Sequence, residues 1–344
     1  MIAQGRMSQT PGLQPTFLEK IAMNTRLSGA DSPSGQVKAG AASTVLSGVT
    51  IDHIRPPGAA LPAGSCDCHV HIFDPVRFPY ATERTYTPAA AVTADLLAFE
   101  RRLGIDRIVL VQPSGYGTDN SCLLDALRQL STARARGVAV IDLPRITASE
   151  IDGLHAAGVR SIRLNLEVKG EQSPAKAKAL LTEAFQVVES PGWSIQIYAD
   201  ASVIASVADL IAQAHTPVVL DHFGGIKAER GLAQPGFSSV LELIANDHAY
   251  VKLSAPYRAS KLPGYEDLAP FAHRYIETAP HNLVWASDWP HTGSSTNRGG
   301  DLSQVEPFRL IDDGASLDLL RTWAGDAGTF QRILVDNAAR LYGF

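Results

Sequence analysis

The stretch Ser65-Cys66-Asp67-Cys68-His69-Val70-His71-Ile72-Phe73 decides the fold that this sequence predicts. It alternates, and in a β-strand residues two apart point to the same face. We therefore expect Asp67, His69 and His71 on one face, and Cys66 and Cys68 on the other face, under helices. Two neighbouring histidines at the end of an apolar strand, followed by alternating strand and helix signals, predict an α/β barrel with its polar groups at that end.

Strand-like and helical segments alternate along the rest of the chain. Strands are expected at 65–72, 106–112, 138–143, 159–164, 193–198, 217–220, 250–253 and 282–286, and helices at 93–103, 119–135, 147–157, 174–189, 202–213, 237–246, 266–278, 315–325 and 328–341. The strands are mostly β-branched and apolar, which is typical of a parallel sheet covered by helices. The sequence thus predicts an α/β protein, a TIM-like (β/α)8 barrel over residues 63–344.

Residues 1–62 differ in composition from this regular part. They are rich in Gly, Ser, Ala, Thr and Pro and contain a single aromatic residue, Phe17. Such a segment buries little apolar surface, so we expect an extension that is largely disordered or loosely draped. Its early charges do not precede an uninterrupted apolar run, so no signal peptide is predicted.

Charge and cysteine content exclude several classes of partner. A net charge of −5 and a pI near 6.1 give no basic surface for nucleic acid. The sequence has no run of about 18 apolar residues, so no transmembrane helix is predicted. Three cysteines in a long chain fit a reducing compartment better than a disulfide framework, so we expect a cytoplasmic protein. We also expect either a monomer or a small homo-oligomer.

Polar side chains follow most of the predicted strands at their carboxyl ends. Because these ends surround one opening of a barrel, the side chains are expected to meet there. In strand order they are His69 and His71, Gln112 and Ser114, Arg163, Asn165 and Lys169, Tyr198 and Asp200, Asp221 and His222, Ser254, Tyr257 and Arg258, and Asp288 and His291. Imidazoles, a carboxylate and several cations together suit the attack of water on a carbonyl of an anionic substrate.

The residue types suggest a division of labour. Asp288 would take the proton from water, and the histidines would polarise the carbonyl or stabilise the oxyanion. Arginine and lysine would bind substrate carboxylates, and arginine could do so through two parallel hydrogen bonds. Simpler interpretations remain open: the histidines could be hydrogen-bonded core residues, and the arginines could pair with carboxylates of the protein. Tyr86 and Tyr198 could simply be packed aromatic residues, and Ser114 could simply form a turn.

With these residues placed, the chain resembles the amidohydrolase superfamily, in the branch of 2-pyrone-4,6-dicarboxylate lactonase, sugar-acid lactone isomerases and muconolactone hydrolases. The resemblance covers about four fifths of the chain. It is carried by Cys66–Pro75, Phe78–Ala81 with Arg84–Pro88, Val111–Asn120, Val159–Asn165, Leu220–Gly224, Lys252–Arg258 and Ser287–His291. Residues 1–62 have no counterpart in it.

The resemblance implies a barrel that hydrolyses a lactone bearing carboxylates. It implies Asp288 as the base, with His69, His71 and His222 around the scissile carbonyl. The implied substrate-binding residues are Tyr86, Ser114, Arg163, Lys169, Tyr198 and Arg258, to which we add His291. Where the branch continues Asp-His-Phe-Gly with an arginine, this chain has Gly225. Since a charge-assisted hydrogen bond contributes roughly 1.5–3 kcal/mol, we expect a smaller or less charged lactone than 2-pyrone-4,6-dicarboxylate.

The sequence leaves two versions of the chemistry open. Superfamily members that use a divalent metal usually have a histidine at the end of strand five, where this chain has Tyr198. His69, His71 and Asp288 could still hold Zn²⁺ or another divalent ion, with water at the open position. Arg163 would oppose a cation, so we expect no required cofactor. The alternatives are a metal-dependent hydrolase or decarboxylase, a sugar-acid lactone isomerase, and a non-catalytic barrel that binds an organic acid.

Overall fold

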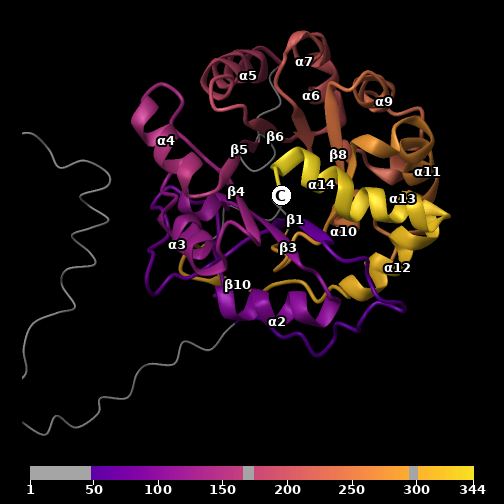
Figure 1. The fold of residues 1–344 in the computed structure, drawn as a ribbon, viewed down its shortest axis with the longest axis horizontal. Coiled ribbons are helices and arrows are strands. Elements are labelled where there is room, and N and C mark those ends of the chain that lie inside the picture. Colours follow the sequence, from indigo (N-terminus) through magenta and orange to yellow (C-terminus); the bar gives the residue numbers. More distant parts are fainter. Residues whose placement is uncertain (1–47, 166–173, 294–300) are drawn as a thin grey trace, which may run out of the picture. The chain divides into compact units, whose positions relative to one another are not determined.

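The structure, a computed structural model, describes residues 48–165, 174–293 and 301–344 (Figure 1). Its main sheet has eight parallel strands in the order β1-β3-β4-β5-β6-β7-β8-β9. They are β1 (Cys66–Val70), β3 (Arg107–Val111), β4 (Ala135–Ala139), β5 (Val159–Asn165), β6 (Ser194–Tyr198), β7 (Val218–Leu220), β8 (Ala249–Ser254) and β9 (Leu283–Ala286). Each strand pairs with the next one in the order through a parallel ladder.

The sheet closes on itself where the segment after β9 meets β1. Asp288 N donates to His69 O at 3.0 Å, and His71 N donates to Trp289 O at 2.9 Å. A parallel bridge joins Val70 to Trp289 between these bonds. The predicted (β/α)8 barrel is therefore confirmed.

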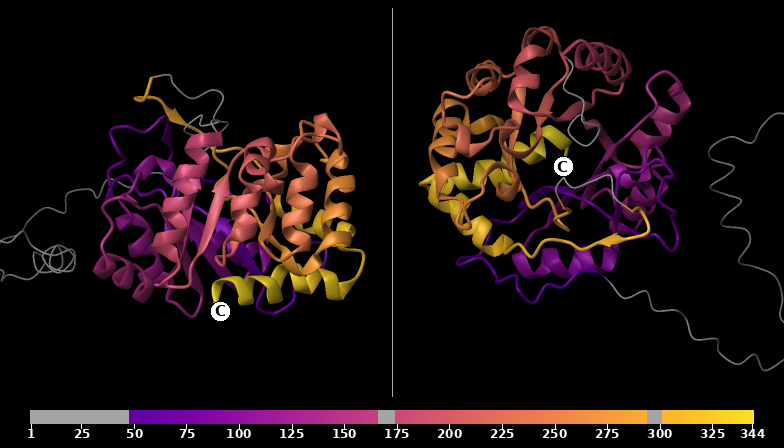
Figure 2. Two further views of the ribbon diagram at one scale, coloured as in Figure 1. Left: turned by 90° about the horizontal axis from the view of Figure 1, so that it is seen from above. Right: turned by 180° about the vertical axis from the view of Figure 1, so that it is seen from behind.

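Helices surround the strands on the outside (Figures 1 and 2). The helices of the described residues, which include α14 at one end of the barrel, are α2 (Thr93–Leu103), α3 (Ser121–Leu130), α4 (Ala148–Ala156), α5 (Pro174–Val188), α6 (Ala201–Ser206), α7 (Ala208–Gln213), α8 (Asp221–Gly224), α9 (Phe237–Ala245), α10 (Pro256–Ala259), α11 (Ala269–Thr278), α12 (Asp313–Ala324), α13 (Ala327–Gln331) and α14 (Asn337–Tyr342). Among the described residues, no helix has the length and apolar character needed to cross a membrane.

The two ends of the barrel are covered differently. Figure 2 shows α14 across one end and the short strand β10 (Val305–Glu306) at the other. β10 pairs in parallel with β2 (Thr87–Pro88), so the loop after β9 is tied to the loop after β1. Of the N-terminal extension, residues 1–47 lie outside the described residues. In the described part Ile54 is buried, and Arg55 pairs with Asp318 at 2.6 Å.

The third predicted strand was placed about three residues too late. The helix before it ends at Leu130, and Ser131 has a φ of 64°, so the chain turns early into β4. Arg136 and Gly137 lie inside this strand and obscure its apolar pattern. Both have packing reasons: Arg136 donates to Tyr342 O, and a Cβ at Gly137 would lie 2.8 Å from Leu127 Cδ1.

The predicted outward direction of Cys66 and Cys68 was wrong. The two cysteines pack with Val109, Val138, Val219 and other strand residues in a cluster that Ala338 and Tyr342 of α14 close. The register of β1 shifts between Asp67 and Val70, so simple alternation does not continue through the strand. Because of this irregularity, His69 can face the same interior as the cysteines that precede it.

Gly225 lies where α8 packs against the end of β6. Its φ is 72°, and a Cβ there would lie 1.9 Å from Ala199 O. This contact is with backbone, so a neighbouring side chain cannot relieve it by moving. This chain path has no space for any side chain at residue 225, so an arginine there would require a different backbone path.

We predict that Gly225→Ala lowers the free energy of unfolding by about 2–5 kcal/mol, the sum of a left-handed backbone penalty and overpacking. Gly325→Ala is the matched control, because Gly325 has a φ of 75° with open space around it. It should lose only about 1–2 kcal/mol. Urea denaturation of both variants measures the difference, and equal losses would contradict the close backbone contact.

Candidate active site

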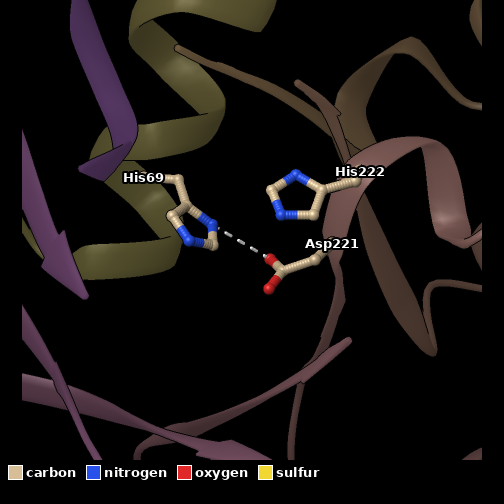
Figure 3. A group of neighbouring side chains, drawn as sticks. All are labelled: His69, Asp221 and His222. Atoms are coloured by element: carbon tan, nitrogen blue, oxygen red, sulfur yellow. Dashed lines mark ion pairs between the residues drawn. The ribbon is translucent and has the colours of Figure 1, made fainter. Parts of the chain in front are cut away.

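The predicted side chains meet at the end of the barrel where the strands finish. His69 lies in β1 and His71 just after it, Arg163 lies near the end of β5, and Asp288 follows β9. Figure 3 shows His69 reaching from β1 toward Asp221 and His222, which follow β7. All of these residues are at most 7% exposed, so the groups are held in a site with little access for water.

The turns after three neighbouring strands share an uncommon backbone conformation. His222 after β7, Ala255 after β8 and Asp288 after β9 have φ values of 49°, 46° and 67°. A residue with a side chain pays roughly 1–3 kcal/mol to stay in this region, and such residues cluster at functional sites. The sharp turns leave the side chains of His222 and Asp288 at the opening.

Asp288 is the most heavily contacted carboxylate of the site. Its Oδ2 accepts hydrogen bonds from Tyr257 OH and Arg258 Nε, both at 2.7 Å. Its Oδ1 faces three imidazoles, at 3.4 Å from His71 Nε2, 3.6 Å from His69 Nε2 and 3.9 Å from His222 Nε2. Burial alone would raise the pKa of Asp288, but Arg258 and the histidines hold it well below the usual 3.8.

The three imidazoles have different surroundings. His71 Nδ1 is 2.7 Å from Val111 O, and His222 Nδ1 is 2.9 Å from Ser254 Oγ. His69 is completely buried, with its Nε2 at 3.2 Å from His71 Nε2. Burial lowers the pKa of each imidazole, that of His222 to about 3, so all three are neutral near pH 7.

A second polar network lies beneath the histidines. Lys252 of β8 is fully buried and places Nζ 2.6 Å from Gln196 Oε1, 3.2 Å from Asp221 Oδ1 and 3.3 Å from His69 Nδ1. Gln196 Nε2 in turn donates to Asp221 Oδ2 at 2.8 Å. Lys252 and Gln196 had no role in the sequence analysis. Polar residues inside otherwise apolar barrel strands were the available signal.

A small pocket, with a cavity volume of ≈ 20 Å³, opens above these networks. It is lined by His71, Tyr86, Pro113, Ser114, Arg163, Tyr198, His222, Arg258, Asp288 and Thr292. Most of the predicted catalytic and substrate-binding residues are thus brought together. Arg163 Nη1 donates to Gln112 O at 3.5 Å. Arg163 Nε has no hydrogen-bond partner among the described residues and lies 3.8 Å from Asp221 Oδ2, so its N–H is available to an anion.

Of the predicted catalytic and substrate-binding residues that the structure describes, two, His69 and His291, do not line this pocket. His69 lies behind His71 and can act on a bound molecule only through it. His291 is buried with Nε2 at 2.9 Å from Asp313 Oδ2, which places it behind the wall, and its substrate-binding role has no contact to support it. Lys169 lies outside the described residues. Pro113 and Thr292 line the pocket without having been predicted.

The group His69, His71 and Asp288 has the spacing of a metal site. The three candidate ligand atoms are 3.2–3.6 Å apart, and a tetrahedral ion with bonds of about 2.1 Å needs edges of about 3.4 Å. The second possible group, His69, Asp221 and His222, has the Lys252 ammonium beside two of its members. The donor spacing fits a divalent ion, whereas the surrounding cations oppose it.

The chain is similar to several known proteins whose names are those of hydrolases. The chain is 36% identical over 296 residues to 4-sulfomuconolactone hydrolase of Rhizobium radiobacter, covering 84% of this chain and 93% of the relative. It is 33% identical over 297 residues to 2-pyrone-4,6-dicarboxylate hydrolase of Comamonas testosteroni, covering 83% and 92%. The chain also resembles a solved Acinetobacter baumannii structure, described as a probable 2-pyrone-4,6-dicarboxylic acid hydrolase with citric acid bound. The two superpose with a TM-score of 0.69 at 26% identity, over 82% of this chain and 100% of that one.

The family model described as amidohydrolase matches residues 66–344, which is nearly the whole described barrel. The match begins at β1 and includes every strand that contributes to the pocket. This chain therefore belongs to the amidohydrolase family.

Proposed function

We propose that this protein hydrolyses a lactone that carries an anionic group, with Asp288 as the base that activates water. The observation that carries this proposal is the position of Asp288 Oδ1, which faces the pocket-lining imidazoles of His71 and His222. A carboxylate kept ionised beside neutral imidazoles, with a guanidinium that has an N–H available, suits attack of water on a carbonyl in an anionic molecule.

Two groups carry the proposed reaction, the Asp288 carboxylate and the His222 imidazole. Asp288 Oδ1 takes a proton from water as the oxygen of that water attacks the lactone carbonyl. The carboxylate 3.9 Å away favours a proton on His222 Nε2, so Nδ1 accepts from the Ser254 hydroxyl. His222 Nε2–H then stabilises the oxyanion. On collapse the ring C–O bond breaks, and Asp288 returns the proton to the leaving oxygen.

Arg163 is the natural partner of the anionic group of the substrate. Two carboxylates of the site, Asp221 and Asp288, are outnumbered by the cations Lys252, Arg163 and Arg258. Arg258 is committed to Asp288, and Lys252 is sealed below the pocket. The excess positive charge therefore lies at Arg163, and an anionic substrate balances it. The relatives named for sulfonated and carboxylated lactones, and the relative with bound citric acid, support this assignment.

The same charges favour hydrolysis without a metal. His69, His71 and Asp288 would hold a divalent ion, which would supply Lewis-acid polarisation of the carbonyl. Such an ion would add two positive charges to a site that already has one cation in excess. The residues described above provide the base, the oxyanion donor and the anion site by themselves.

Asp288→Asn should lower kcat by roughly 10²–10⁴-fold, because the amide cannot take a proton from water. The barrel should remain folded, since Tyr257 and Arg258 still have a polar partner. Steady-state kinetics on a panel of carboxylated and sulfonated lactones, with circular dichroism, measure both effects. Asp142→Asn changes an exposed carboxylate in the same way and should leave kcat unchanged. Retained turnover in Asp288→Asn would remove the proposed base.

Arg163→Met should raise KM for an anionic lactone by roughly 10–150-fold, equivalent to the loss of a charge-assisted hydrogen bond worth about 1.5–3 kcal/mol. kcat should change much less. An uncharged lactone of the same ring size is the control, and its KM should not rise. An equal rise for both lactones would assign Arg163 a structural role through Asp221 instead.

Removal of divalent metal should leave hydrolysis intact. Protein purified with a chelator and analysed by elemental mass spectrometry should turn over the lactone at the rate of untreated protein. Added Zn²⁺ should not raise kcat. Loss of activity on chelation, restored by a stoichiometric ion, would replace this route with the metal-dependent alternative.

A further inference from the structure

Glu100 is a buried acidic residue that the proposed reaction does not use. It lies on the inner face of α2, whose other buried residues are Thr93, Leu96, Phe99 and Leu103. Its side chain is completely buried, and neither Oε1 nor Oε2 has a hydrogen-bond partner among the described residues. Because burial without a hydrogen-bond donor disfavours an ionised carboxylate, these surroundings favour the neutral acid.

The inner face of α2 packs against the seam of the barrel, which is the pair of backbone bonds that joins the last strand to the first. The ring centroid of Phe99 lies 5.8 Å from that of Trp289 and 6.3 Å from that of His291. Trp289 O accepts one of the two seam bonds, from His71 N. Glu100 is buried beside Phe99 in the chain, so its carboxyl group lies behind the seam.

Three charged residues act on Glu100, and two of them are acidic. Asp67 comes from β1 and Asp313 from α12, where it pairs with His291, and both carboxyl groups are at most 1% exposed. Arg134, just before β4, is the cation, but it is only half-buried. Burial raises the pKa of Glu100 well above the usual 4.5, the two acidic neighbours add to this effect, and Arg134 opposes it.

Asp67 connects this buried acid to the seam. Its Oδ1 accepts from His69 N at 3.1 Å and from Ser287 N at 3.0 Å, so one carboxyl oxygen joins β1 to the segment after β9. These two donors favour the ionised form of Asp67. A negative charge on Glu100 would repel that carboxylate with no donor of its own to offset the cost. The repulsion would act on the junction between the first and last strands.

We propose that Glu100 is held as a neutral acid behind the seam, and that its ionisation in alkaline solution loosens the closure of the barrel. The barrel then responds to pH through a group that does not line the pocket. The inference is independent of the proposed hydrolysis, and each of its tests can be made on a protein that turns over no lactone.

The direct test is the ¹³C spectrum of the full-length protein with label only in the glutamate side-chain carboxyl groups, so that no aspartate contributes. At pH 7 one glutamate signal should have the chemical shift of a neutral acid, and Glu100→Gln should lack it. A wild-type spectrum in which every glutamate is ionised at pH 7 would overturn the proposal, even if the variant does not fold.

Urea denaturation from pH 5 to 8 measures the consequence for stability. Above the ordinary pKa of glutamate, the unfolded chain releases a proton that the folded chain keeps, so stability falls as the pH rises. The unfolding equilibrium constant of wild type, divided by that of Glu100→Gln, should therefore rise close to tenfold for each pH unit until Glu100 ionises in the folded protein. A ratio that stays constant over this range would contradict the neutral acid.

Glu183→Gln is the matched control for this measurement, because it makes the same change at an exposed position of α5. It should leave the pH dependence of wild-type stability unchanged. A pH dependence altered equally by both variants would assign the effect to net charge and overturn the role of Glu100.

Amide hydrogen exchange tests the link to the seam. At a pH where Glu100 is ionised, the amides of His71 and Asp288 should exchange faster in wild type than in Glu100→Gln at the same pH. The ladder between β5 and β6 lies farthest from the seam in the strand order and should exchange alike in both proteins. Ionisation of Glu100 without faster exchange at the two seam amides would overturn the proposed loosening.

Discussion

Closure of the barrel is the interaction on which the site depends. The bonds from Asp288 N to His69 O and from His71 N to Trp289 O join the last strand to the first. The same residues carry the carboxylate and imidazoles of the pocket. Closing the sheet and placing Asp288 Oδ1 within 3.6 Å of two histidines are therefore a single structural event. A change that opened this seam would separate the base from its neighbours before it exposed much core.

Charge is the second constraint, because five ionised groups lie in a nearly dry interior. Burying an ion costs several kcal/mol unless partners satisfy it. Asp221 meets this requirement through Lys252 and Gln196, and Asp288 through Arg258 and Tyr257. Arg163 is the group left with an unbonded nitrogen. The network is thus complete at its base and incomplete at its mouth, which is where an anionic ligand would enter.

The sequence predicted the barrel and the pocket because both follow from periodic patterns and strand ends. Eight apolar strands and the residues after them identified Asp288, His222 and Arg163 without knowledge of distances. Pattern reasoning was wrong where the backbone is irregular: the register shift in β1 reversed the expected direction of Cys66 and Cys68, and Arg136 and Gly137 displaced β4. His291 follows Asp288 closely, but its φ of 68° and its contact with Asp313 take it behind the pocket wall.

Lys252 shows why sequence reasoning could not assign the interior network. A lysine in a strand is normally a solvated residue of an edge or an outer face. Its meaning here comes from three partners that lie 56, 31 and 183 positions away along the chain, on β6, after β7 and on β1. No local pattern encodes that meeting. The geometry also gives it a consequence: the ammonium balances the charge of Asp221 one layer below the residues that line the pocket.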